Sequence, residues 1–389
     1  MRFKMSNRVS KMCTLVPSLA VLMLTACGGG GDGHTGLTAK IQTPVPPASY
    51  SLALRPLPAI YTSSATKAIN YSAYRTAGGP NQSEIPTDAQ ILQDLTLLNS
   101  AGYTLLRLFD TDISHENILR VAQANFPQIK FHLGIYLQGI APGNQASCTM
   151  PANDADVNNG IREANTYPNV VTVSVGNETS FFAPYMPVHC LAGYITTVKQ
   201  QVQQPITADD DYTFYAGQSG ATELPDTVLP LLDFASIHTY PMSNSGRWAS
   251  TGTGSAANMM NLAFLNAQST YTQVANYIST HGAAANLPII VGETGWKAVR
   301  TNTASALETC CANPINAKMY FDAMNSWQTG ATGPKIVFYF EAFDEVWKAT
   351  DDGWGIWDTS RTSRYALCGS SATNAPACTV PPYLNATFQ

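Results

Sequence analysis

The sequence predicts a single (β/α)8 barrel, an α/β fold, over residues 59–366. Short apolar runs alternate with longer amphipathic segments through this region, and such alternation is typical of a parallel sheet with right-handed crossovers. The region also has the length that this barrel usually needs. An open doubly wound sheet is the alternative, but no Gly-x-Gly-x-x-Gly follows a predicted strand and no phosphate-loop motif is present.

Eight runs in this region are candidate strands. Most of them are almost continuously apolar, as expected of parallel strands that are buried on both faces. They lie at Ala68–Tyr74, Thr104–Phe109, Lys130–Leu137, Val170–Val175, Pro205–Ala208, Phe234–His238, Pro288–Val291 and Lys335–Phe340.

Three of the intervening segments carry clear helix-start signals. Thr87 and Gln90 are spaced as a capping box ahead of an apolar stripe. Asn153 is a predicted N-cap, and Asn313 followed by Pro314 is an N-cap with proline at the first helical position. These signals place helices after the first, third and seventh strands.

The first 26 residues predict an export signal that is not part of the fold. A basic stretch precedes the apolar run Leu15–Leu24, which is too short to span a membrane. Leu24-Thr25-Ala26-Cys27 follows and resembles a bacterial lipobox. We therefore expect cleavage before Cys27 and acyl chains that hold this residue in the membrane; the alternative is an ordinary secretory signal. Gly28, in place of a retention aspartate, allows an outer-membrane location if the cell is Gram-negative.

Residues 27–58 are rich in glycine and proline and are expected to form a flexible tether. An exported protein folds in an oxidising compartment, so its six remaining cysteines should form disulfides. Cys368–Cys378 would close a loop in the C-terminal tail, residues 367–389, and Cys148–Cys190 would join two barrel loops. Cys310 and Cys311 would form a vicinal disulfide or pair elsewhere. No Cys-x-x-Cys is present and the histidines lack ligand spacing, so no metal is expected.

The charge balance excludes some classes of partner. Four of the 21 basic residues lie in the signal, so the remaining chain has 17 basic and 26 acidic side chains and a net charge of −9. A net acidic chain without a basic run is a poor nucleic-acid binder. Charged residues make up only 12% of the chain, and 18 tyrosines are present, which suits a neutral, hydroxyl-rich ligand. No cofactor is implied, and the tether favours a monomer.

Two glutamates stand at the ends of predicted strands. Glu178 follows the fourth strand and Glu293 follows the seventh. Catalytic residues of such barrels lie at the carboxyl ends of the strands, and these two strands lie nearly opposite each other. Hydrolysis of a glycosidic bond needs two carboxyl groups, one of which protonates the leaving oxygen. Either glutamate alone would be a surface residue or a helix cap, but the pair predicts a glycosidase.

The residues around these glutamates extend the pattern. The motifs are Val175-Gly176-Asn177-Glu178, Gly292-Glu293-Thr294-Gly295-Trp296, Phe340-Glu341-Ala342-Phe343-Asp344-Glu345 with Trp347-Lys348, Ile69-Asn70-Tyr71-Ser72, Arg107-Leu108-Phe109-Asp110 and His238-Thr239-Tyr240-Pro241. Together they resemble glycoside hydrolase family 17, which contains β-1,3-glucanases and β-1,3-glucan transferases. The resemblance covers about Ala68 to Asp358 and implies a retaining enzyme on a barrel.

The resemblance also implies roles for individual residues. Glu178 would be the general acid/base and Glu293 the nucleophile. Asn177 would bind the sugar 2-hydroxyl, and Tyr240 would hold the Glu293 carboxylate. The other expected substrate-site residues are Tyr71, Asp110, and a polar cluster of Glu341, Glu345 and Lys348. The pKa of the acid should be raised by burial and by its neighbour.

The late aromatic residues offer a platform for sugar. A flat indole can cover the apolar face of a pyranose, and we expect Trp296 and Trp354 to do so. Trp357 is expected to pack within its loop. Arg107 suits a structural role and a functional role equally, whereas structural roles are expected for His132 and His238.

The resulting hypothesis is a retaining endo-β-1,3-glucanase bound to the membrane through Cys27. Two positions depart from the family pattern: Lys297 replaces a proline, and Asp352 replaces a glutamate before Trp354. They leave the linkage and the acceptor open. The alternatives are a β-1,3-glucan transglucosidase, a relative that cleaves β-1,4-glucan or mannan, and a non-catalytic carbohydrate-binding lipoprotein.

Overall fold

A computed structural model describes residues 53–379, apart from residues 149, 182–183, 219–222, 244–255, 282–284, 329 and 331. The predicted export signal, Cys27 and most of the predicted tether lie outside the described residues. Within the described part of the chain, no helix is both long enough and apolar enough to cross a bilayer.

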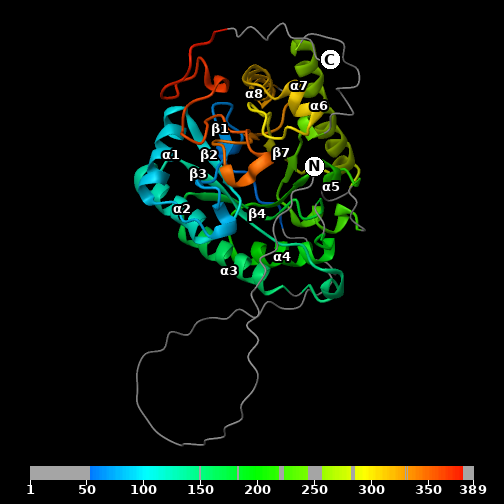
Figure 1. The fold of residues 1–389 in the computed structure, drawn as a ribbon. Coiled ribbons are helices and arrows are strands. Elements are labelled where there is room, and N and C mark those ends of the chain that lie inside the picture. The colour runs from blue at the N-terminus through cyan, green and yellow to red at the C-terminus, as the bar shows by residue number, and fades with distance from the viewer. Residues whose placement is uncertain are drawn as a thin grey trace, which may run out of the picture.

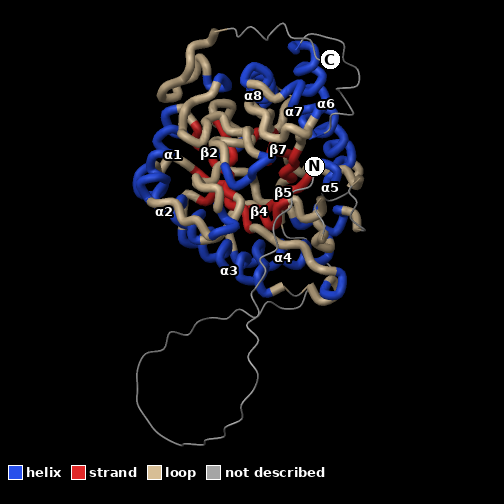
Figure 2. The backbone as a smooth tube through the Cα atoms, in the orientation of Figure 1, coloured by secondary structure: helices blue, strands red, loops and turns tan. Residues whose placement is uncertain are grey.

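Eight parallel strands close into a barrel in sequence order, and β1 pairs with both β2 and β8. They are β1 (Lys67–Asn70), β2 (Tyr103–Leu108), β3 (Lys130–Ile135), β4 (Val170–Asn177), β5 (Ile206–Asp211), β6 (Ala235–His238), β7 (Ile289–Thr294) and β8 (Val337–Tyr339). Each strand overlaps the run predicted for it, so the predicted barrel is confirmed. Figure 2 shows the strands as a central group enclosed by helices.

The helices surround the barrel. They are α1 (Asp88–Ser100), α2 (Ile113–Asn125), α3 (Pro151–Thr166), α4 (Val188–Gln201), α5 (Tyr212–Tyr215), α6 (Ala256–Ser279), α7 (Ala306–Cys311) and α8 (Pro314–Gln328). In Figure 1, α1 to α4 follow one half of the circumference and α5 to α8 follow the other. The apolar faces of these helices and the outer faces of the strands share one continuous core.

Two of the three predicted helix starts are confirmed. The Thr87 hydroxyl accepts from the Gln90 N–H at 3.3 Å, and the Gln90 side chain accepts from the Thr87 N–H at 2.8 Å. Asn313 Oδ1 accepts from the Asn316 N–H at 2.9 Å at the start of α8. Both caps satisfy amide groups that the helix leaves without a partner.

The N-cap predicted at Asn153 is wrong. Helix α3 begins two residues earlier, at Pro151, and its N-cap residue is Met150. The Asn153 side chain is buried and instead pairs with the backbone N–H and C=O of Gln138, at 2.8 and 2.9 Å. Asn153 therefore joins α3 to the loop before it and does not cap the helix.

The two ends of the barrel interior differ in polarity. At the amino ends of the strands, Tyr61 packs on Phe234 and Phe338, with ring centroids 5.9 and 6.1 Å apart. Towards the carboxyl ends the interior contains buried charged groups, including Arg107 and Asp209. Because buried charges persist only when they are paired, this polar layer identifies the end of the barrel that carries chemistry.

The folded domain begins before residue 59. Arg55 donates from its guanidinium to Gln204 O at 2.7 Å and to Lys199 O at 2.6 Å. The Arg55 N–H also donates to Asp233 Oδ1 at 2.7 Å. Arg55, near the end of the predicted tether, is therefore held against the barrel.

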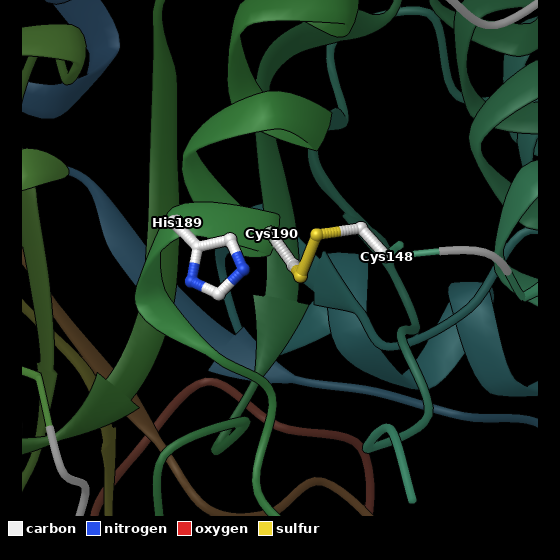
Figure 3. A group of neighbouring side chains, drawn as sticks. All are labelled: Cys148, His189 and Cys190. Carbon is white, nitrogen blue, oxygen red and sulfur yellow. A yellow bond between two sulfur atoms is a disulfide. The ribbon is translucent and has the colours of Figure 1, made fainter. Parts of the chain in front are cut away.

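Among the described residues, three disulfides are present, namely Cys148–Cys190, Cys310–Cys311 and Cys368–Cys378. The two pairings expected from the sequence are confirmed, and Cys310 and Cys311 form the vicinal disulfide. Figure 3 shows Cys148, from the loop after β3, bonded to Cys190 on α4, with His189 beside the bridge. The bridge therefore fixes the start of α4 against the loop after β3.

Candidate active site

Glu178 follows β4 directly and has an unusual backbone conformation. Its φ is 49°, in the left-handed region that costs free energy for a residue with a side chain. The Glu178 N–H donates to Asp209 O on β5 at 2.8 Å, so the neighbouring strand holds this conformation. Such strain is concentrated at functional sites, which makes Glu178 a candidate independently of its motif.

Glu293 lies on β7 between two glycines that neighbouring strands require. A Cβ atom on Gly292 would lie 2.3 Å from Ser236 Oγ on β6, and one on Gly295 would lie 2.1 Å from the Phe340 carbonyl oxygen after β8. Both distances are far below van der Waals contact. The glycines therefore let β6 and β8 approach on either side of Glu293.

The barrel brings the two glutamates together. One carboxylate oxygen of Glu178, one of Glu293 and a ring nitrogen of His238 all lie within 4.8 Å of one another. The side chains of Glu178 and Glu293 are 15% and 7% exposed. Both carboxylates are therefore largely removed from water and still keep an accessible face.

The buried guanidinium of Arg107 contacts Glu293 and several polar side chains around it. Its guanidinium donates to Glu293 Oε1 at 2.5 Å, to Asp209 Oδ2 at 2.7 Å, to Asn177 Oδ1 at 2.6 Å and to Asn70 Oδ1 at 2.9 Å. These four acceptors belong to β7, β5, β4 and β1, so one buried cation on β2 joins its own strand to four others. Arg107 therefore contacts the expected nucleophile and also stabilises the fold, which supports both roles considered for it.

The two carboxyl groups have opposite pKa shifts. Burial raises the pKa of Glu178, the negative charge of Glu293 adds to this, and the hydrogen bond and charge of His238 act against it. Burial alone would also raise the pKa of Glu293. The charges of His238 and Arg107 and the hydrogen bonds from Tyr240 and Arg107 outweigh burial and lower that pKa. One group is thus suited to hold a proton while the other stays ionised.

Tyr240 contacts Glu293 as predicted. Its hydroxyl donates to Glu293 Oε2 at 2.6 Å. Burial, followed by the nearby charge of Glu293, raises the pKa of the Tyr240 phenol, so the phenol stays protonated and acts as a donor. Asn177 also lies at this site, and its oxygen accepts from Arg107. Its NH2 group is therefore the part of the amide that can donate to a sugar hydroxyl.

His238 is the main residue whose place in the site the sequence analysis missed. Its Nδ1 lies 2.9 Å from Glu178 Oε1, and its Nε2 lies 3.7 Å from Glu293 Oε1. Burial lowers the pKa of His238, but the charges of Glu293 and Glu178 outweigh burial and raise it. Side chains two residues apart on a strand share a face. The inward position of Tyr240 could therefore have identified His238 as well.

A second charged cluster follows β8. Lys348 Nζ lies 2.5 Å from Glu341 Oε2 and also contacts Glu345 Oε2, and Ser72 donates to Glu345 Oε1. Burial raises the pKa of Glu341, and Lys348 opposes this. Burial would also raise the pKa of Glu345, but the charge of Lys348 and several hydrogen bonds lower it. The structure therefore brings together the predicted cluster of Glu341, Glu345 and Lys348, at the carboxyl end of β8.

Two predicted sugar contacts are wrong. Tyr71 is 1% exposed, and its hydroxyl lies 3.3 Å from Asp94 Oδ2 on α1. Trp296 has no exposed surface, and its indole N–H donates to Cys311 O on α7 at 2.9 Å. Both side chains are packed in the hydrophobic core, so neither exposes the ring surface that a sugar contact needs.

Trp354 and Asp110 lie beside the site. Trp354 is 5% exposed, and its ring packs edge-on against Tyr240 with centroids 5.4 Å apart. It therefore packs against Tyr240 and leaves little of its ring surface for a sugar. Asp110, after β2, is half-buried and accepts from the Thr111 N–H at 2.7 Å. Asp110 follows β2 and Glu178 follows β4, so both lie at the carboxyl ends of the strands.

Two groups among the described residues have the spacing of metal ligands. In the first group, the sulfur atoms of Cys148 and Cys190 are bonded to each other beside His189, so they offer no thiolate (Figure 3). The second group is Glu178, His238 and Glu293. The guanidinium of Arg107 already holds a Glu293 oxygen, and this positive charge repels a metal cation. Acid–base chemistry therefore suits the second group better than metal binding.

The fold and the site together define the class of protein. A parallel barrel that brings together two carboxyl groups, one with a raised pKa and one with a lowered pKa, has the arrangement of a glycosidase. The family model of the BtgE/BtgC glycoside hydrolase domain matches residues 68–356. The chain belongs to this family.

Comparisons with individual proteins are consistent with this family. The chain is 28% identical over 209 residues to a glucan 1,3-beta-glucosidase of Schizosaccharomyces pombe, an alignment that covers 51% of this chain and 57% of that protein. The chain thus spans little more than half the length of this relative. The structure resembles an endo-laminarinase from Formosa, with a TM-score of 0.67, 22% identity and coverage of 79% and 87% of the two chains. It also resembles plant beta-glucan endohydrolases, with a TM-score of 0.52, 15% identity and coverage of 76% and 98%.

Proposed function

We propose that the chain is a retaining glycosidase that cleaves β-1,3-glucan within the polymer, as a member of glycoside hydrolase family 17. The observation that carries the proposal is the distance of at most 4.8 Å between a Glu178 oxygen and a Glu293 oxygen. Retaining enzymes hold their carboxyl groups about 5–5.5 Å apart, whereas inverting enzymes need about 6.5–9.5 Å to admit a water molecule. The separation supports double displacement.

In the first step, Glu293 attacks the anomeric carbon while Glu178 protonates the glycosidic oxygen, so the bond to the leaving sugar breaks and a glycosyl ester forms. Glu178 is then ionised. In the second step it takes a proton from water, whose oxygen attacks the anomeric carbon and releases Glu293. Arg107 and Tyr240 stabilise Glu293 as a carboxylate before the first step and after the second.

The proposed substrate rests on the motifs that resemble family 17 and on the names of the relatives. The panel that tests it contains laminarin, curdlan, lichenan, cellulose and mannan. We expect release of sugar from laminarin and curdlan, a rapid fall in polymer length, and initial products with the β configuration by NMR. Preference for cellulose or mannan would refute the linkage, and initial α products would refute retention.

The alternative of a carbohydrate-binding protein without activity is tested on the same panel. Glu293→Gln should abolish hydrolysis and leave binding of laminarin intact. A wild-type protein that binds laminarin and hydrolyses none of the five polymers would support this alternative instead.

Transfer to a sugar acceptor is a second candidate, and one observation favours it. Two aromatic side chains on the connection from Glu178 to α4 are well exposed: Phe181 at 46% and Tyr185 at 38%. Exposed aromatic rings can cover an acceptor sugar that would compete with water for the glycosyl ester. Products longer than the starting laminari-oligosaccharide would establish transfer, and shorter products alone would establish hydrolysis.

We also propose that Cys27 carries the lipid that holds the enzyme at the outer face of a bacterial membrane. Basic residues, an apolar run and small residues before Cys27 support this proposal. Labelled palmitate should be incorporated into the wild-type protein and not into Cys27→Ser, which should leave the membrane fraction. Retention of Cys27→Ser in that fraction would refute the anchor.

A further inference from the structure

Lys297 is a buried cation one residue after Trp296. Its side chain is 1% exposed, and its ammonium group lies 2.8 Å from Glu308 Oε1 on α7 and 3.4 Å from Asp351 Oδ1. It also donates to Thr350 O at 3.0 Å and to Thr301 Oγ1 at 3.2 Å. A charge that is removed from water persists only when such partners compensate it.

These partners belong to two separate connections. Thr301 and Glu308 lie between β7 and α8, whereas Thr350 and Asp351 lie in the segment after β8. The same connections are joined by the Ala298 N–H, which donates to Gly353 O at 2.8 Å. Lys297 is therefore the charged centre of a contact between the loops that follow β7 and β8.

A short series of contacts leads from Lys297 to Glu293. Lys297 Nζ lies 5.3 Å from the centroid of the Trp354 ring, and the Trp354 indole N–H donates to Asp351 O at 2.9 Å. Trp354 packs on Tyr240, with centroids 5.4 Å apart and planes at 70°. Tyr240 in turn donates to Glu293 Oε2 at 2.6 Å.

We propose that Lys297 is a positioning residue: by holding Trp354 against Tyr240, it maintains the hydrogen bond from Tyr240 to the nucleophile Glu293. This inference rests on the proposed glycosidase function. In the described part of the chain, Lys297 contacts Glu308, Asp351, Thr301, Thr350 and the Trp354 ring but neither Glu178 nor Glu293, so it acts through Trp354 and Tyr240.

The alternative is a purely structural role, and the two roles predict different behaviour. A buried ion pair that only stabilises the fold can be replaced by groups of similar size with little loss. Replacing a positioning residue should also change the pKa of Glu293. The titratable groups that face Glu293 are Arg107, Glu178, His238 and Tyr240, and Lys297 reaches this set only through Tyr240.

The test compares Lys297→Met/Glu308→Gln, which removes both charges of the pair, with the wild type. The matched control is Lys199→Met/Asp233→Asn, which removes another buried ion pair, 2.8 Å apart, near the opposite end of the barrel. Rates on laminarin between pH 3 and 9 and thermal unfolding are measured for all three proteins. A second variant, Trp354→Phe, tests the same route if the first is poorly folded.

We expect kcat/KM of Lys297→Met/Glu308→Gln to fall by roughly 10–100-fold, since small misplacements of reacting groups have effects of this size. The acid limb of its pH profile should move to higher pH, because the ionised form of Glu293 loses a donor. Trp354→Phe should move the limb in the same direction, and combining the variants should add less than the sum of the separate shifts. The control should unfold at lower temperature and keep its pH profile.

A lower unfolding temperature with an unchanged pH profile would overturn the inference and leave the proposed function intact. Crystal structures of the wild type and the variant provide a readout that needs no activity. The distance from the Tyr240 hydroxyl to Glu293 should be longer in Lys297→Met/Glu308→Gln, and an unchanged distance would also overturn the inference. Absence of activity in the wild type on every glucan would instead count against the proposed function.

Discussion

The imidazole of His238 lies between the two carboxyl groups of the site, 2.9 Å from Glu178 Oε1 through Nδ1 and 3.7 Å from Glu293 Oε1 through Nε2. It lowers the pKa of Glu178, which burial raises, and it lowers the pKa of Glu293 against the effect of burial. One side chain therefore lowers the pKa of both carboxyl groups in the proposed reaction. His238 does this without exchanging a proton with the substrate.

Replacing His238 should move the whole pH profile to higher pH. In His238→Ala the pKa of Glu293 should rise, which moves the acid limb up, and the pKa of Glu178 should rise further, which moves the basic limb up. The measurement is kcat/KM on laminarin as a function of pH. The control is His281→Ala, which removes a partly exposed histidine. A profile that loses height and keeps both limbs in place would contradict this role.

The proton donated by Glu178 should matter only for poor leaving groups. Glu178→Gln should lower kcat/KM on laminarin by several orders of magnitude, and much less on an aryl β-glucoside whose phenolate leaves without protonation. Glu293→Gln should abolish activity on both substrates, because no group remains to attack the anomeric carbon. The two substrates are compared in parallel assays; equal losses in Glu178→Gln would assign the roles differently.

Removing the Arg107 charge should destabilise the fold strongly. Arg107→Met leaves the buried Asp209 carboxylate without its guanidinium partner, and breaking a buried pair in this way costs about 3–5 kcal/mol. Arg107→Met/Asp209→Asn should regain part of the free energy of unfolding and still lack normal activity. Denaturant unfolding measures both, and the exposed pair Arg120–Asp88 gives the control, where Arg120→Met should lower the free energy of unfolding far less than Arg107→Met does.

Glu163 on α3 should make the protein less stable as pH rises. Burial raises the pKa of Glu163 to about 9, and its Oε2 has no hydrogen-bond partner among the described residues. Because the folded pKa is above the unfolded value of about 4.3, stability is full below that value and decreases up to about pH 9. Glu163→Gln should therefore raise the unfolding temperature at pH 8 and have little effect at pH 4.

The control for Glu163 is Glu116→Gln on the neighbouring helix. The hydrogen bond from Arg162 lowers the pKa of Glu116, so its contribution to stability is present at neutral pH and lost in acid. Glu116→Gln should thus lower the unfolding temperature slightly at pH 8. Scanning calorimetry at the two pH values measures both variants, and a gain from Glu163→Gln that is equal at pH 4 and pH 8 would exclude the buried carboxylate as the cause.

Much of the site could be predicted because it lies at strand ends. Glu178 and Glu293 each follow or end an apolar run, and a parallel barrel collects all such ends at one face. The environments of aromatic residues could not be predicted in this way. Trp296 is the last residue of the motif around Glu293, yet its indole N–H donates to the Cys311 carbonyl on α7. That choice depends on how the loop returns, which no local pattern records.

By itself, the sequence determined the barrel, the two caps at Thr87 and Asn313, and the rim position of both glutamates, because periodicity, capping and strand ends are set by interactions between near neighbours. Only the tertiary structure shows why the pKa of Glu178 is raised while that of Glu293 is lowered. That difference depends on burial and on Arg107, His238 and Tyr240, which reach the pair from β2 and β6. Electrostatic interactions in a desolvated interior depend on distance in space, and distance in space follows only from the closed barrel.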